Sequence, residues 1–117
     1  MRLLETMKRS VTVKPAAQAG VYQDTDRLYR FDGSQAVGIR AVVQPLQEKT
    51  AAAVYGETPS VQLLMLYDGD EQLDEGMGVC VDVDASAPCD YRISEMPRRY
   101  PSHKECTLAF IPEPLRA

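Results

Sequence analysis

Apolar residues recur at every second position in several short stretches of this chain, and this alternation limits the folds open to it. A period of two is typical of a β-strand with one buried face, whereas an amphipathic helix needs apolar residues every three or four positions. The predicted strands cover 10–14, 36–43, 61–67, 79–84, 91–93 and 105–110. The sequence therefore predicts a mostly β protein with about six strands.

Turn-forming residues separate these strands. Asp32-Gly33 and Asp68-Gly69 mark loops, and Pro88 and Pro97 interrupt the C-terminal half. The spacing of strands and turns is typical of a small sandwich or barrel. A chain of 117 residues is enough for one domain with one modest core. We therefore expect a single domain over residues 1–117, with residues 1–8 as an N-terminal arm.

Residues 44–60 do not follow the strand pattern. The segment has mild helix propensity at its centre but no apolar stripe that would hold a helix on a core. Connections longer than about 12–15 residues in a compact domain are usually functional or disordered. This long inserted loop is therefore the first candidate for a functional element.

Charge and cysteine content exclude several classes of protein. The formal net charge of −4 argues against a domain that binds nucleic acid tightly through a basic face. The three cysteines are odd in number and show no C-x-x-C spacing, so we expect reduced thiols in a cytosolic setting. Residues 1–10 lack the apolar core of a secretory signal, and we expect no membrane association.

A search for catalytic or metal-binding residues finds none that we would assign. His103 is the one histidine, and beside Lys104 and Glu105 it is typical of a surface residue. A Cys₃His zinc site would need Cys80, Cys89 and Cys106 together with this histidine, but their spacing is irregular. On a strand, Cys106 and His103 point to opposite faces and would not meet as nucleophile and base.

The acidic residues are also best explained without a ligand. The stretch from Asp68 to Gly76 lacks the order of ligands in an EF-hand loop. Asp82 and Asp84 alternate with valines, which indicates that they lie on the solvent-exposed face of a sheet. Arg98-Arg99 with Tyr100 is too small a patch to be a nucleic-acid platform. Because phosphate-binding and nucleophile-elbow motifs are absent as well, we expect neither an enzyme nor a cofactor.

The order of the segments resembles a known family. The matching features are Gln44-Pro45 at the end of a strand, Tyr55-Gly56, Tyr67-Asp68, Asp90-Tyr91-Arg92-Ile93 and a last strand from His103. In this order the chain resembles the head-closure (stopper) proteins, also called minor capsid or head–tail connector proteins, of tailed bacteriophages and prophages. The resemblance covers most of the chain, although many members contain Trp and this chain has none.

The resemblance implies a small antiparallel β-barrel that assembles as a ring, hexameric or dodecameric, in the virion neck. The ring would form in the host cytoplasm and contact the portal or adaptor ring and the tail-terminator or tail-tube proteins. The inserted loop would face the channel and retain packaged double-stranded DNA without sequence-specific binding. The residues near the lumen would be Glu48, Lys49, Thr50, Ala51, Ala52 and Ala53, with Tyr55 and Gly56 where the loop rejoins the barrel.

Physical reasoning is compatible with this role. Small residues let several copies of a loop converge on one axis, and an acidic subunit avoids strong attraction to phosphate. A ring needs head-to-tail contacts that close by rotation. Val42, Leu64 and Leu66 lie on the second face of their predicted strands and are candidate subunit contacts, unless the monomer covers them itself.

Three other functions remain open at this stage. One is another neck protein such as a tail terminator, although those proteins contain more helix than this sequence offers. Another is a soluble, monomeric β-barrel that binds a small ligand or a peptide and orders its long loop around it. The third, a small hydrolase, would need carboxylates that converge in a pocket.

Overall fold

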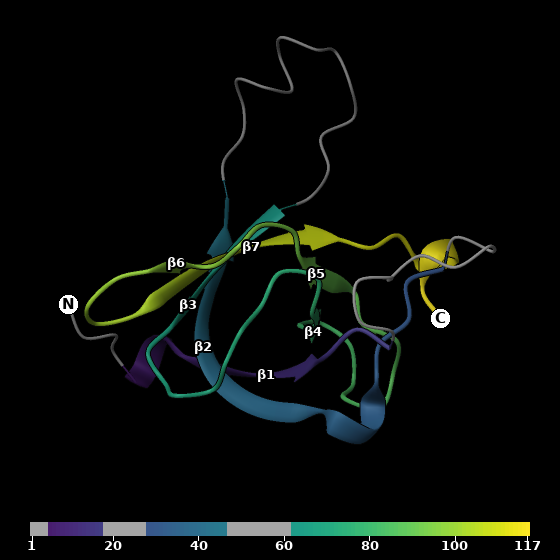
Figure 1. Cartoon of the computed structure of the whole chain (residues 1–117), viewed down its shortest axis with the longest axis horizontal. Helices are drawn as coiled ribbons and strands as arrows, with labels where there is room; N and C mark the ends of the chain where they lie inside the picture. The colour runs from purple at the N-terminus through teal and green to yellow at the C-terminus, as the bar shows by residue number, and fades with distance from the viewer. Residues whose placement is uncertain (1–4, 18–27, 47–61) are drawn as a thin grey trace, which may run out of the picture.

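The structure is a computed structural model, and it describes residues 5–17, 28–46 and 62–117. Seven strands form a single antiparallel sheet (Figure 1). They are β1 (Arg9–Lys14), β2 (Val37–Pro45), β3 (Gln62–Tyr67), β4 (Gly78–Cys80), β5 (Tyr91–Ile93), β6 (Arg98–Arg99) and β7 (Lys104–Phe110). Three short 3₁₀ turns flank them: η1 (Glu5–Met7), η2 (Gly33–Gln35) and η3 (Glu113–Leu115).

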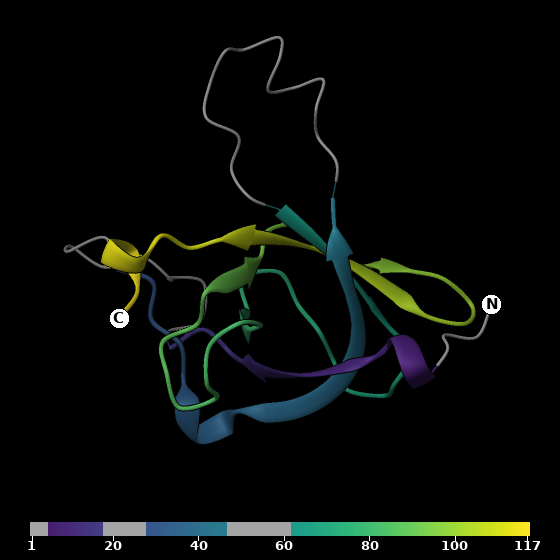
Figure 2. The same cartoon turned by 180° about the vertical axis from the view of Figure 1, so that it is seen from behind.

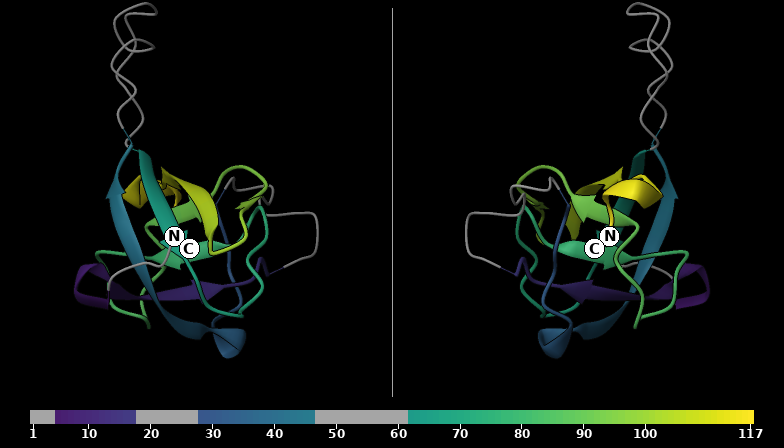
Figure 3. Two further views of the ribbon diagram at one scale, coloured as in Figure 1. Left: turned by 90° about the vertical axis from the view of Figure 1, so that its left-hand side faces the viewer. Right: turned by 90° about the vertical axis from the view of Figure 1, so that its right-hand side faces the viewer.

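Six of the strands close into a barrel. Their order is β3-β2-β1-β4-β5-β7, and β3 pairs with β7 to complete the circle, while β6 lies outside it. The long strand β2 curves around the barrel from one end to the other (Figure 2), and β1 lies on the side opposite β7 (Figure 3). The predicted mostly β fold, a small antiparallel barrel of about six strands, is confirmed.

Alternate residues of each strand fill the interior of the barrel. On β2, Ile39 and Ala41 point inward, and on β1 Val11 and Val13 do the same. Met65, Ile93 and Leu108 are completely buried, together with Val79 and Ala41. Each large apolar side chain buried in this way contributes about 1.5–3 kcal/mol to folding. Alternation in the sequence therefore predicts the strands because one face of each strand supplies this core.

Strand β4 is shorter than its alternating sequence predicts. The alternation of valines with polar residues predicts a strand up to Asp84, but β4 ends at Cys80. The buried carboxylate of Asp90 accepts hydrogen bonds from the backbone N–H groups of Val81 (2.9 Å) and Asp82 (2.9 Å). Because a side chain now satisfies these two donors, the chain leaves the sheet and turns outward. The prediction that Asp82 and Asp84 lie on a strand is wrong for this reason.

Two other boundaries differ from the prediction. Gln44 and Pro45 belong to β2, where they pair with Leu64 and Leu63, so the inserted segment starts after them. Arg98-Arg99, the basic pair that no predicted strand included, forms the outer strand β6. Within the described residues no helix is long and apolar enough to cross a membrane.

Candidate functional site

The inserted segment leaves and rejoins the barrel at neighbouring points. Pro45, the last residue of β2, pairs with Leu63, and the Leu46 N–H donates to the Gln62 carbonyl (3.1 Å). The two stems of the segment are therefore held together at one end of the barrel. The predicted channel residues Glu48, Lys49, Thr50, Ala51, Ala52, Ala53, Tyr55 and Gly56 lie outside the described residues.

The three predicted subunit contacts come together on one outer patch. Val42 and Leu66 are cross-strand partners on β2 and β3, and Leu64 lies two residues along β3 on the same face. Leu64 and Leu66 are partly buried, whereas Val42 is only 5% exposed within the chain. Of these three side chains, the two leucines therefore leave more apolar surface uncovered than Val42 does.

His103 lies in the turn between β6 and β7, immediately before β7, and its ring contacts three neighbouring residues. Its ring stacks on Tyr100 with the centroids 5.0 Å apart. Its Nε2 lies 3.2 Å from Glu105 Oε2, and its Nδ1 lies 3.1 Å from the hydroxyl of Ser102. Cys106 is fully buried in the barrel core, where burial raises the pKa of its thiol to about 11. The structure does not bring His103 and Cys106 together as nucleophile and base.

Hydrogen bonds and an ion pair hold the acidic stretch after β3, from Asp68 to Gly76, against the barrel. Lys8 forms an ion pair with Asp68 (2.9 Å), and Lys104 donates to the Glu71 carbonyl (2.9 Å). The Tyr67 hydroxyl accepts a hydrogen bond from the Glu71 N–H (3.1 Å). In the part of the chain that the structure describes, no group of three or more potential ligands is placed to hold a metal ion.

A second buried cluster lies outside the barrel, and the sequence analysis missed it. Val13 and Val79 point into the core, so Lys14 and Cys80 lie on the other face of the same strands. Residues 81–89 fold back over that face, and Cys80, Cys89 and Lys14 are all buried there. The Lys14 Nζ donates to the Ala87 carbonyl (2.8 Å), which fixes the position of this loop.

The two thiols of this cluster are in contact. The sulfur atoms of Cys80 and Cys89 lie 3.4 Å apart, within the distance of an S–H···S hydrogen bond. When Cys80 loses its proton, Cys89 becomes the donor and stabilises the thiolate. This hydrogen bond, with the charge of Lys14, lowers the pKa of Cys80 to about 7 against the opposing effects of burial and Asp90. The same hydrogen bond, with burial, raises the pKa of Cys89.

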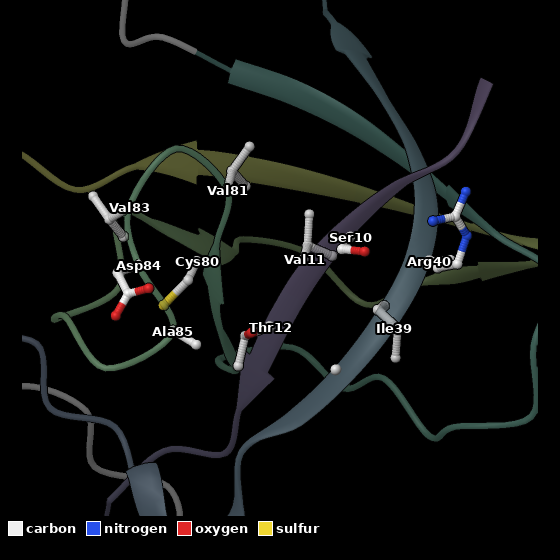
Figure 4. Close-up of a pocket in the computed structure, with 11 residues that line it drawn as sticks. Ser10, Val11, Thr12, Ile39, Arg40, Cys80, Val81, Val83, Asp84 and Ala85 are labelled. Atoms are coloured by element: carbon white, nitrogen blue, oxygen red, sulfur yellow. The ribbon is translucent and has the colours of Figure 1, made fainter. Parts of the chain in front are cut away.

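A depression of about 360 Å³ opens onto Cys80 from the outside of the barrel (Figure 4). Ser10 and Thr12 of β1 and Arg40 of β2 form one wall, and Asp84 and Ala85 of the outer loop form the other. Cys80 lines this depression and its sulfur points toward the loop. Hydrogen bonds from the Ser86 hydroxyl and N–H lower the pKa of Asp84, so this wall is negatively charged at neutral pH.

Comparisons with known proteins were made by family model, by curated sequence and by solved structure, and none gave a match. The resemblance to head-closure proteins therefore stays a prediction. The missed cluster could have been suspected from two cysteines nine positions apart, but their contact depends on how residues 81–88 fold back.

Proposed function

We propose that this protein is a structural subunit of a tailed-phage neck, a head-closure protein that forms a ring below the portal. In this role it closes the channel over packaged double-stranded DNA and offers a docking surface to the tail. The observation that carries the proposal is the position of the inserted segment. It connects two hydrogen-bonded strand ends, at Pro45 and Gln62, on one end of a closed barrel.

This arrangement suits a ring subunit because the barrel provides a rigid base for the segment. The two ends of the segment are held side by side, and 15 residues, 47–61, separate them in the sequence. The net charge of −4 favours a channel through which DNA passes without binding tightly to its wall. Leu64 and Leu66 supply an apolar outer patch of the kind that subunit contacts use.

The main alternative of a different class is a monomeric β-barrel that binds a small ligand. Such barrels often hold the ligand in their interior, but here apolar side chains pack the interior, among them the completely buried Met65, Ile93 and Leu108. In the described part of the chain, a ligand would instead use an outer depression, such as the one beside Cys80 or the one between Tyr67 and His103. We therefore favour the neck protein over the ligand-binding module.

The proposal can be tested by shortening the inserted segment in particles that carry this protein. Replacing residues 48–56 by a two-residue Gly-Ser link keeps both stems paired, so the barrel folds and the neck assembles. We expect such particles to lose packaged DNA, measured as the fraction of DNA that becomes accessible to a nuclease.

A matched control replaces the same residues by a Gly-Ser segment of equal length. Because mechanical closure depends on chain in the channel, we expect this variant to leak less than the shortened one. If both variants retain DNA as well as the wild type, the segment does not close the channel and the proposal fails.

A further inference from the structure

Cys80 and Cys89 stand at the two ends of one loop. Cys80 ends β4, and Cys89 lies two residues before β5, which pairs with β4 through Val79 and Tyr91. The loop between the cysteines therefore returns to its starting point, with the sulfur atoms 3.4 Å apart. A disulfide bond is about 2.05 Å long, so a small rotation of the side chains would bring the sulfurs to bonding distance.

We propose that Cys80 and Cys89 are a reversible dithiol–disulfide pair that reacts with low-molecular-weight disulfides. Cys80 is the attacking thiol and Cys89 is the resolving thiol. The inference does not depend on the proposed role in a phage neck, because it uses only the contacts of this pair.

The two thiols take different roles because their surroundings differ. Cys80 is only 3% exposed but lines the outer depression, so a small reagent that enters there meets Cys80 first, whereas Cys89 is 1% exposed and does not line it. The charged groups that face the pair are Lys14 from β1, which favours a thiolate, and Asp90 before β5, which opposes it. The hydrogen bond from Cys89 lowers the pKa of Cys80 and so favours its thiolate, which is the reactive form.

The reaction proceeds in two exchange steps. The Cys80 thiolate attacks one sulfur of the small disulfide, so that a mixed disulfide forms and one small thiolate leaves. Cys89 then loses its proton to solvent, and its sulfur attacks Cys80 Sγ and releases the second small thiolate. The two cysteines lose two protons and two electrons, which reduce the small disulfide to two thiols.

The third cysteine provides an internal control. Cys106 is completely buried in the barrel core, does not line the depression and has a raised pKa. In the native protein, iodoacetamide should therefore alkylate Cys80 at least about 100-fold faster than Cys106 at pH 7. Equal rates for the two thiols would contradict the assigned reactivity.

The direct test treats the reduced, full-length chain with 2-hydroxyethyl disulfide at pH 7, followed by mass spectrometry of the intact protein and of its peptides. The expected product has lost two hydrogen atoms, carries a Cys80–Cys89 cross-link and keeps Cys106 as a free thiol. Adding dithiothreitol should restore the starting mass. The wild-type chain alone gives this result, so the test does not rely on a variant that folds.

Two variants separate the roles of the thiols. Cys89→Ser should accumulate the mixed disulfide on Cys80, since nothing resolves it, whereas Cys80→Ser should leave Cys89 largely unmodified. Cys106→Ala, a matched control, should form the cross-link as the wild type does. The proposal is overturned if the wild type keeps three free thiols, or if its mixed disulfide at Cys80 never resolves.

Discussion

Replacing Asp90 by alanine removes the carboxylate that ends β4, and the structure sets the size of the expected loss. Asp90 is 2% exposed and accepts hydrogen bonds from the N–H groups of Val81 and Asp82, each at 2.9 Å. Leaving a buried N–H without a partner costs about 1–3 kcal/mol. The Val81 donor is buried and the Asp82 donor is partly exposed to water, so we expect Asp90→Ala to lower the free energy of unfolding by about 2–4 kcal/mol.

Urea unfolding followed by far-ultraviolet circular dichroism measures this loss by linear extrapolation. Asp90→Asn keeps one carbonyl oxygen for one of the two donors and should lose about half as much as the alanine variant. Asp82→Ala is the matched control, since its ion pair with Arg9 is exposed and should contribute less than about 0.5 kcal/mol. If Asp90→Ala unfolds within about 0.5 kcal/mol of the wild type, the carboxylate does not hold this turn.

Three further predictions concern packing and the turn after β3, and each is measured by the same unfolding experiment. Gly78→Ala places a Cβ 2.7 Å from the Phe31 ring and should lower the free energy of unfolding by about 1–3 kcal/mol. Gly38→Ala, which has open space at its Cβ, should change this free energy little. Equal effects of the two variants would contradict the described packing at Gly78. Tyr67→Phe removes the hydroxyl that holds the next turn and should cost about 1 kcal/mol, and no loss would mean that the hydroxyl is dispensable. Leu108→Ala empties a fully buried core position and should cost about 2–5 kcal/mol, so a loss below about 1 kcal/mol would argue against the described core.

The strands of the barrel could be predicted from the sequence because each buries alternate residues. Val11 and Val13, or Ile39 and Ala41, carry the signal directly, since the same side chains build the core. The signal fails where a side chain replaces the sheet as a hydrogen-bond partner, as Asp90 does at the end of β4. It also fails for β6, which has two exposed residues and no buried face.

The outer cluster could not be predicted because its contacts depend on the path of a loop. Lys14 is the last residue of the alternating strand β1, and nothing in the sequence indicates that its ammonium group meets the Ala87 carbonyl. The contact of Cys80 with Cys89 likewise requires residues 81–88 to fold back over the barrel. Sequence patterns record which face of a strand is apolar, but they do not record which loop covers the other face.

Cryo-electron microscopy of particles that carry the protein can show whether this barrel is, as we propose, a ring subunit of a phage neck. If such particles are not at hand, the protein can be mixed with its portal–adaptor complex instead. A ring subunit should give density for a closed ring on the neck axis, with the segment between Pro45 and Gln62 facing the channel. If the protein stays monomeric and never joins the neck, it is not a neck protein. The ligand-binding barrel would then better explain its structure.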